Sequence, residues 1–135
     1  MSVVGVGIDL VDIARMEAML ARLGDRLLAR LLTDRERAYV VAKYSPARHL
    51  AARVAAKEAT YKALQGLLGS RGIGWREMEV VPDGAGRPAM VLHGLAARLA
   101  AEQGPLVVHL SLSHSDRTAG AVAVAERRGA ADPGD

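Results

Sequence analysis

The stretch 46–68 constrains the fold of this chain most strongly, because it predicts one long helix with charged residues inside an alanine-rich sequence. Ser45 is a good N-cap, Pro46 suits the first helical position, and Gly69 closes the stretch. Leucine, valine and tyrosine recur at helical spacing along one face, and Lys57 falls in line with them. The domain must therefore bury this face against its other elements.

Glu58 and Lys62 are four residues apart and share a second face of that helix. The commoner meaning of such a pair is a surface salt bridge, which contributes only about 0.3–0.5 kcal/mol. Two features favour a functional site instead. Lys57 stands on the apolar face, and small alanines surround the pair where long solubilising side chains would be expected. A carboxylate beside lysines, with room around it, suits a metal-bound phosphate.

The segment 3–11 reads as a buried strand, with Gly5, Gly7 and Asp9 on one side, where the glycines are expected to leave space beside the carboxylate. The other side is apolar: Val4, Val6, Ile8 and Leu10. A bare buried carboxylate is costly, so Asp9 either accepts backbone hydrogen bonds or binds a hard cation, and the strand alone leaves both readings open. Because Mg²⁺ takes one or two carboxylates, Asp9 and Glu58 could share one ion if strand and helix pack together.

The remaining pattern indicates an α+β fold. Asp12 is a good N-cap for a helix over 13–23, and Thr33 with Glu36 has the spacing of a capping box for another helix. Further helices are expected at 25–32 and 95–103, and strands at 78–82, 88–92, 106–113 and 118–126. The late strands suggest antiparallel pairs, and two βαβ-like halves are also compatible with the order. Residues 1–127 are expected to form one domain and 128–135 a disordered tail.

Composition narrows the class of protein. The 135 residues include no Cys, which removes disulfides and thiolate metal sites, and no Phe, which leaves a core of small and aliphatic side chains. Burying more surface in a homo-oligomer is one way to stabilise such a chain. The net charge of +3 and the pI of 9.7 fit an anionic partner: a nucleotide, a nucleic acid or an acidic protein. The segment 3–11 lacks the basic start of a signal peptide and no run is long enough to span a bilayer, so a cytoplasmic protein without membrane contact is expected.

Other candidate groups are less specific. His114 stands among the hydroxyls of Ser111, Ser113 and Ser115, which is more typical of a turn than of a catalytic centre, and no nucleophile-elbow sequence surrounds the serines. Glycine turns at 72–74 and 83–87 could offer amides to a phosphate but match no nucleotide fingerprint. Arginines that are either solvated or steer an acidic partner crowd the first helices: Arg15, Arg22, Arg26, Arg30, Arg35 and Arg37.

Four stretches then carry a family resemblance in their order and spacing: 5–15, 32–36, 53–63 and 108–115, the last continuing through 119–126. They resemble the small bacterial holo-[acyl-carrier-protein] synthases, the short type of the 4′-phosphopantetheinyl transferase superfamily, over nearly the whole chain. The resemblance implies one long helix packed on a largely antiparallel sheet, and a homotrimer with active sites between subunits. It also implies a Mg²⁺-dependent reaction. The 4′-phosphopantetheine arm of coenzyme A moves to a serine of apo acyl carrier protein, adenosine 3′,5′-bisphosphate leaves, and fatty acid biosynthesis is supported.

By position, the resemblance implies that Asp9 and Glu58 are the Mg²⁺ carboxylates and that Lys62 pairs with the pyrophosphate. With His114 near the phosphates, these residues form the expected catalytic set. The expected coenzyme A contacts are Arg53, Lys62, Gly86, Arg87, Pro88 and His114. Arg15 and Arg22 are expected to face the acidic helix of the carrier protein, whereas the general base and the role of Lys57 stay unassigned.

The chain departs from the family pattern near the nucleotide. A Lys-Arg pair often precedes the long helix, near the 3′-phosphate, but residues 43–48 here leave that contact unassigned. The loop 66–74 is longer than in many relatives, and Val54 and Tyr61 stand where members often have Phe. From the residues alone, the alternative function is a basic nucleic-acid-binding domain that uses the arginine-rich helices and glycine loops. It lacks the interleaved aromatic residues of a single-strand binder.

Overall fold

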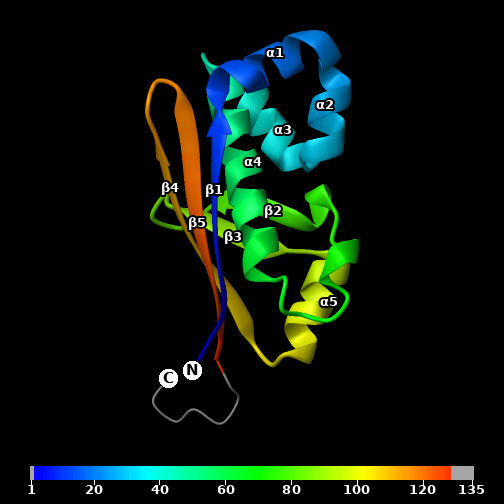
Figure 1. The fold of residues 1–135 in the computed structure, drawn as a ribbon. Coiled ribbons are helices and arrows are strands. Elements are labelled where there is room, and N and C mark those ends of the chain that lie inside the picture. Colours follow the sequence, from blue (N-terminus) through cyan, green and yellow to red (C-terminus); the bar gives the residue numbers. More distant parts are fainter. Residues whose placement is uncertain (1, 129–135) are drawn as a thin grey trace.

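A three-stranded antiparallel sheet, a separate hairpin and five α-helices make up the computed structural model, which describes residues 2–128 (Figure 1). The predicted α+β class is confirmed. In chain order the elements are β1 (Ser2–Asp12), α1 (Ile13–Leu23), α2 (Asp25–Leu31), α3 (Asp34–Val41), α4 (Pro46–Ala63), the short 3₁₀ turns η1 (Ser70–Gly72) and η2 (Trp75–Glu77), β2 (Met78–Pro82), β3 (Pro88–Leu92), α5 (Gly94–Glu102), β4 (Leu106–His114) and β5 (Thr118–Arg127).

The main sheet joins the beginning of the chain to its end. Its strand order is β1-β5-β4, and β2 pairs with β3 in the hairpin expected from the sequence. Every strand pairing within residues 2–128 is antiparallel, so the alternative with two βαβ halves is not formed. α4 runs along one face of the main sheet, while α1, α2 and α3 gather at one end of it (Figure 1). In the hairpin, β2 packs against α4 and β3 lies beside β4, while α5 packs near the 3₁₀ turns and β4 at the end of the molecule opposite α1, α2 and α3 (Figure 1).

The packing of α4 on the sheet is unusually close, and it corrects one prediction. A Cβ added to Gly7 would lie 1.8 Å from the carbonyl oxygen of Ala59, and one added to Gly5 would lie 1.8 Å from that of Ala63. The expectation that these glycines leave open space for a ligand is therefore wrong, because the helix backbone fills it. Buried alanines of β5 line the same contact, and we call the whole set the seam: Gly5, Gly7, Ala59, Ala63, Ala119, Ala121, Ala123 and Ala125.

The other side of β1 is exposed, although the sequence predicted a strand buried on its apolar side. Val6, Ile8 and Leu10 are 61%, 61% and 70% exposed. In the register of the sheet, Ile8 lies opposite Val122 of β5, which is also exposed. We call these four side chains the outer apolar face. The error arises because alternation shows which residues share a side of a strand but not which side is covered.

Local signals located the helix ends well in the first half of the chain. The Asp12 side chain accepts hydrogen bonds at the start of α1, and Thr33 and Glu36 form the expected capping box at the start of α3. α4 ends at Ala63, five residues before the predicted end at Leu68, because the chain tightens into a turn in which the Leu64 amide donates to two carbonyls.

The predicted disordered tail, 128–135, lies outside the described residues except for Arg128. No helix among the described residues is both long and apolar enough to cross a membrane.

Candidate functional site

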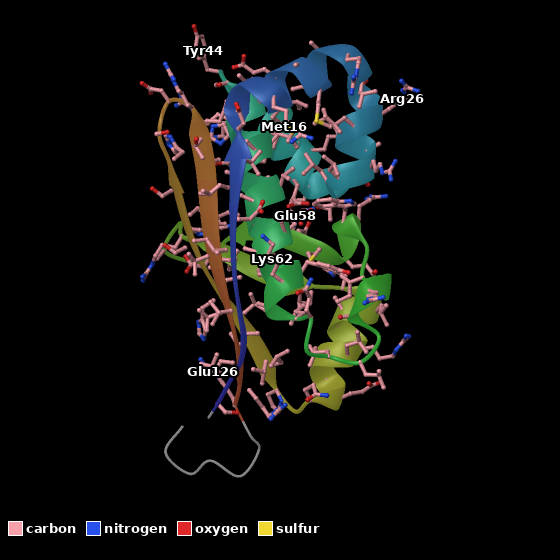
Figure 2. The ribbon with its side chains drawn as sticks, viewed as in Figure 1. Met16, Arg26, Tyr44, Glu58, Lys62 and Glu126 are labelled. Carbon is pink, nitrogen blue, oxygen red and sulfur yellow. The ribbon has the colours of Figure 1, made fainter. Side chains whose placement is uncertain are left out.

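Asp9, Glu58 and Lys62 meet where β1 crosses α4. The Lys62 ammonium donates to Asp9 Oδ1 at 3.2 Å and to the Ile8 carbonyl oxygen at 2.9 Å. Figure 2 shows Glu58 and Lys62 on the same side of α4, one turn apart. Lys62 thus binds the strand, and the surface pair with Glu58 is not formed. The structure brings together the three side chains that the sequence analysis assigned to metal and pyrophosphate.

The charge balance in this group favours a cation. Burial raises the pKa of Glu58, the nearby Asp9 carboxylate raises it further, and Lys62 acts in the opposite direction. No three His, Cys, Asp or Glu side chains form a metal cluster in the described part of the chain. Two carboxylates are nevertheless what Mg²⁺ takes from a protein when substrate phosphates and water complete its coordination. The hard oxygen ligands and their mutual repulsion fit such an ion.

Asp9 and Glu58 line a cavity of about 740 Å³, which we call the carboxylate cavity. Its far wall comes from α1 and α2, with Met16 and Leu27 among its apolar residues and with Arg15, Arg26 and Arg30. Of the two arginines predicted for the carrier protein, Arg15 lines this cavity. Arg22 is exposed on α1 and is not among the lining residues. Arg26 and Arg30 were not singled out from the other arginines, although their spacing of four places them on one helix face.

The predicted nucleotide contacts lie elsewhere. Arg53, Gly86, Arg87, Pro88 and His114 line a second cavity of about 380 Å³, which we call the histidine cavity. Its lining shares no residue with that of the carboxylate cavity. Lys62, which the resemblance places both in the catalytic set and among the coenzyme A contacts, bonds to Asp9 and does not line this cavity. A single chain therefore separates the predicted site residues into two groups.

The histidine cavity is built to receive negative charge. Its lining contains no Asp or Glu. The Arg53 guanidinium stacks 4.2 Å from the centre of the Tyr39 ring, and its buried Nε has no hydrogen-bond partner within the described residues. Burial lowers the pKa of His49, and the charges of Arg53 and Lys43 lower it further. Tyr39 and His49 were missed from the sequence because neither belongs to the motif stretches that carried the resemblance.

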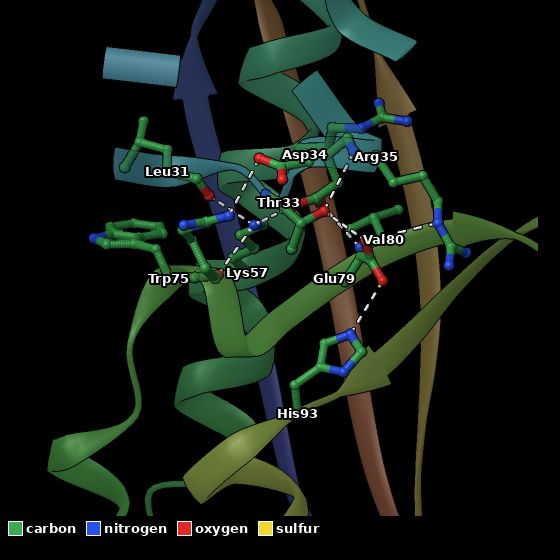
Figure 3. Close-up of polar contacts among 12 residues, drawn as sticks. Leu31, Thr33, Asp34, Arg35, Lys57, Trp75, Glu79, Val80 and His93 are labelled. Atoms are coloured by element: carbon green, nitrogen blue, oxygen red, sulfur yellow. Dashed lines mark hydrogen bonds and ion pairs between the residues drawn. The ribbon is translucent and has the colours of Figure 1, made fainter. Parts of the chain in front are cut away.

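The charged end of the Lys57 side chain lies in neither of these two cavities. Its side chain is fully buried, and its ammonium donates to the Leu31 carbonyl (2.7 Å), Glu36 Oε1 (2.6 Å) and the Trp75 carbonyl (3.0 Å) (Figure 3). Burial lowers the pKa of Lys57, while the adjacent Glu36 carboxylate opposes that shift. Lys57 stands on the apolar face of α4, where a solvated helix would not place a lysine, because it is the cation of a buried ion pair with Glu36.

The sequence and the fold of this chain both resemble those of known proteins. Residues 5–123 match the model of the 4′-phosphopantetheinyl transferase superfamily. A holo-[acyl-carrier-protein] synthase of Solidesulfovibrio magneticus is 47% identical over 90% of this chain and 97% of its own length. A holo-[acyl-carrier-protein] synthase structure from Neisseria meningitidis superposes with a TM-score of 0.80 at 31% identity, covering 93% of this chain and 100% of that one. A Bacillus anthracis enzyme of the same name, in complex with CoA (3′,5′-ADP), gives a TM-score of 0.75 at 32% identity over 93% of this chain and 98% of that chain.

Proposed function

The chain belongs to the 4′-phosphopantetheinyl transferase superfamily as a holo-[acyl-carrier-protein] synthase, and from that premise we propose the details of its reaction. It moves the 4′-phosphopantetheine arm of coenzyme A to a serine of apo acyl carrier protein, depends on Mg²⁺, and supports fatty acid biosynthesis in the cytoplasm. The observation that carries the proposal is the meeting of Asp9, Glu58 and Lys62 at the wall of an arginine-lined cavity. The carrier is an acidic protein, and the arginines from α1 and α2 suit it.

Asp9 and Glu58 are the residues that would hold Mg²⁺, which when bound would neutralise charge on the pyrophosphate of coenzyme A. In the transfer, the serine oxygen bonds to the phosphorus next to pantetheine. The bond from that phosphorus to the bridging oxygen breaks, the serine proton is released, and adenosine 3′,5′-bisphosphate leaves with the bond's electron pair. Lys62, held 3.2 Å from Asp9, stands where its charge stabilises the departing phosphate. The protein's part is to position and to neutralise charge, which such transfers need most.

The adenosine bisphosphate half of coenzyme A is assigned to the histidine cavity. Arg53, Arg87 and His114 supply donors there, and Gly86 with Pro88 shapes the hairpin loop beside them. The buried Arg53 Nε, which has no partner among residues 2–128, supports an anionic ligand at this wall. The 3′-phosphate is assigned to the same cationic region, where Lys43 stands 4.3 Å from the centre of the Tyr39 ring.

The two separate cavities support an assembly in which neighbouring chains complete each other's sites. The carboxylate cavity has the metal ligands, and the histidine cavity has the nucleotide donors. If one chain's carboxylate cavity faces its neighbour's histidine cavity, the contact is head-to-tail, and a rotation of about 120° per chain closes such contacts into a three-membered ring. The outer apolar face offers the surface for it. We assign the homotrimer implied by the family resemblance on these grounds.

Replacing Ile8 by Glu is expected to break this assembly without unfolding the chain, since Ile8 is 61% exposed. Light scattering should report a trimer for the wild type and a monomer for Ile8→Glu, and transfer should be lost with the assembly. The matched control is Leu68→Glu, because Leu68 is 94% exposed outside this face. A wild-type chain that is monomeric and fully active contradicts the shared site.

Mixing two inactive variants tests the shared site directly. His114→Ala damages the nucleotide half and Glu58→Gln the metal half, so a mixed ring regains sites with both halves intact. Random equal mixing in a closed ring should restore about one quarter of the wild-type activity, since each site needs one intact half from each neighbour. A mixture that stays inactive after subunit exchange, verified by mass spectrometry of the assembly, means that each chain holds its whole site.

The function itself is tested by incubating the protein with coenzyme A, Mg²⁺ and an apo acyl carrier protein. The carrier should gain the mass of a phosphopantetheine group on one serine, and chelating the metal should abolish the gain. A carrier with that serine replaced by Ala is the control. No mass gain with several apo carriers, from a protein that is folded and assembled, refutes the proposed reaction.

A further inference from the structure

The buried ammonium of Lys57, in α4, bonds to two other elements that line the carboxylate cavity and to α3 behind them. The three donors of Lys57 bond to the end of α2 through Leu31, to α3 through Glu36, and to η2 through Trp75 (Figure 3). Leu31 and Trp75 themselves line the carboxylate cavity, as does Glu58, the next residue after Lys57 in α4. Three elements that line this cavity, α2, η2 and α4, therefore meet at a single atom behind its wall.

The partner carboxylate extends the connection to the other cavity. Glu36 Oε1 also accepts from the Thr33 amide at 3.0 Å, and Oε2 accepts from the Val80 amide at 3.0 Å. Val80 lies in β2 and lines the histidine cavity. Glu36 is 1% exposed and Lys57 0%, so neither group can exchange its partners for water without the structure opening.

Stability alone is a poor reason for such a pair. Apolar residues of similar volume often replace a buried ion pair with no loss of stability, because the charges must give up their hydration. Hydrogen bonds are directional and hold their partners in one arrangement, which apolar packing does not do. The core lacks Phe and rests on small and aliphatic side chains. The short helix α2 packs Leu27, Leu28 and Leu31 into that core, and the bonds of the buried ammonium add a fixed connection from its last turn to α3, α4 and η2.

We propose that Lys57 and Glu36 are positioning residues that fix α2 and η2 relative to Glu58, and so set the shape of the carrier-binding wall. The proposal rests on the proposed function, because the carrier protein is assigned to that wall. Neither residue touches substrate. Their effect acts through Trp75, Leu31 and the α2 arginines Arg26 and Arg30.

The test separates position from stability by replacing the whole pair. In Lys57→Met/Glu36→Leu no buried charge remains, so its urea midpoint should lie well above that of Lys57→Met alone. It should stay below that of the wild type, because the Leu31 and Trp75 carbonyls and the Val80 amide lose their partners. Removing the partners that orient metal ligands typically costs about 10- to 100-fold in activity, and we expect an effect of the same size for the residues that orient this wall. For the folded double variant we expect kcat/KM for the apo carrier to fall by that factor, mainly through a higher KM for the carrier. The KM for coenzyme A should change less.

Trp75 gives a readout that needs no activity, because it is the only Trp in the chain. Its emission should shift to the red, and acrylamide should quench it more strongly, in the double variant than in the wild type. The matched control is Val40→Ala, which removes buried atoms from α3 but no hydrogen bond to the walls. It should lower stability and leave both Trp75 quenching and the carrier KM unchanged.

A stable double variant with wild-type carrier KM and wild-type Trp75 quenching overturns the proposal. If the double variant does not fold, Lys57→Arg decides: its guanidinium keeps the charge but cannot aim three donors at the same three acceptors, so a wild-type carrier KM overturns the proposal as well. Failure of the proposed function is distinguishable, since the wild type would then load no carrier while the Trp75 comparison would still report on the position of η2.

Discussion

Glu58→Gln should leave a folded protein whose rate of carrier loading falls by about 100-fold or more, the cost of removing one group that stabilises charge in a transition state. Gln keeps the shape of Glu58 but not its charge, so the metal site is left with Asp9 alone. Asp9→Asn should have a comparable effect, and it also removes the charge that Lys62 contacts at 3.2 Å. The measurement is the initial rate of carrier mass gain over a range of Mg²⁺ concentrations.

The raised pKa of Glu58 determines the expected direction of two further effects, one on stability and one on the pH dependence of Mg²⁺ activation. Burial and the Asp9 charge raise this pKa, so the folded state favours the protonated carboxyl. That contribution to stability is present below the unfolded-state pKa and is lost as the pH rises through the folded-state pKa. Gln mimics the neutral form, so Glu58→Gln should be no less stable than the wild type at pH 7. In the wild type, Mg²⁺ activation should fall on acidification at a higher pH than an ordinary glutamate would give.

The control for this pair of results is Glu17→Gln, a change of the same size at an exposed position of α1. It should leave the rate, the Mg²⁺ dependence and the stability as they are in the wild type. Near-wild-type rates of Glu58→Gln or Asp9→Asn at low Mg²⁺ would show that these carboxylates do not hold the metal.

Gly7→Ala should prevent stable folding, the largest structural effect expected from a single methyl group in this chain. The new Cβ would lie 1.8 Å from the Ala59 carbonyl oxygen, and a helix backbone cannot yield as a flexible side chain can. Overpacked cores lose about 1–3 kcal/mol and occasionally more, and this contact is at the severe end because backbone meets backbone. Circular dichroism with urea titration measures the loss, which should exceed about 3 kcal/mol.

Gly84→Ala is the matched control, because an added Cβ there meets nothing within 4 Å. It should change the unfolding free energy little, whereas Gly5→Ala should repeat the effect of Gly7→Ala at the Ala63 carbonyl. A Gly7→Ala chain with a wild-type urea midpoint would mean that α4 does not lie against β1 as closely as described.

Much of the fold could be predicted because its signals are local. The cap at Asp12, the capping box of Thr33 and Glu36, and the hairpin around 83–87 depend on a few neighbouring residues, and the structure confirms them. The surroundings of β1 could not be predicted. The same alternation fits a strand whose glycines admit a ligand and one whose glycines admit a helix, and only the packing of α4 decides between them.

The candidate site was likewise predictable only in part. Helical spacing placed Glu58 and Lys62 on one face of α4, and the structure brings Asp9 to that face as expected. The order of motifs along the chain could not reveal that Arg53 and His114 line a different cavity. Nor could it reveal what holds Lys57, since its acceptors are 18 to 26 residues away, and two of them are backbone carbonyls that belong to any sequence.

The seam between α4 and the sheet also determines how this chain can diverge. Where a helix backbone touches strand glycines, each residue along the contact can change only to one of equal or smaller size. Substitution by a larger side chain is therefore not tolerated there. Elsewhere in the core, an aliphatic residue can be exchanged for another with compensation nearby. The glycines and alanines of the seam should therefore be among the positions that change most slowly. They catalyse nothing, yet they hold the catalytic strand and helix at a fixed separation.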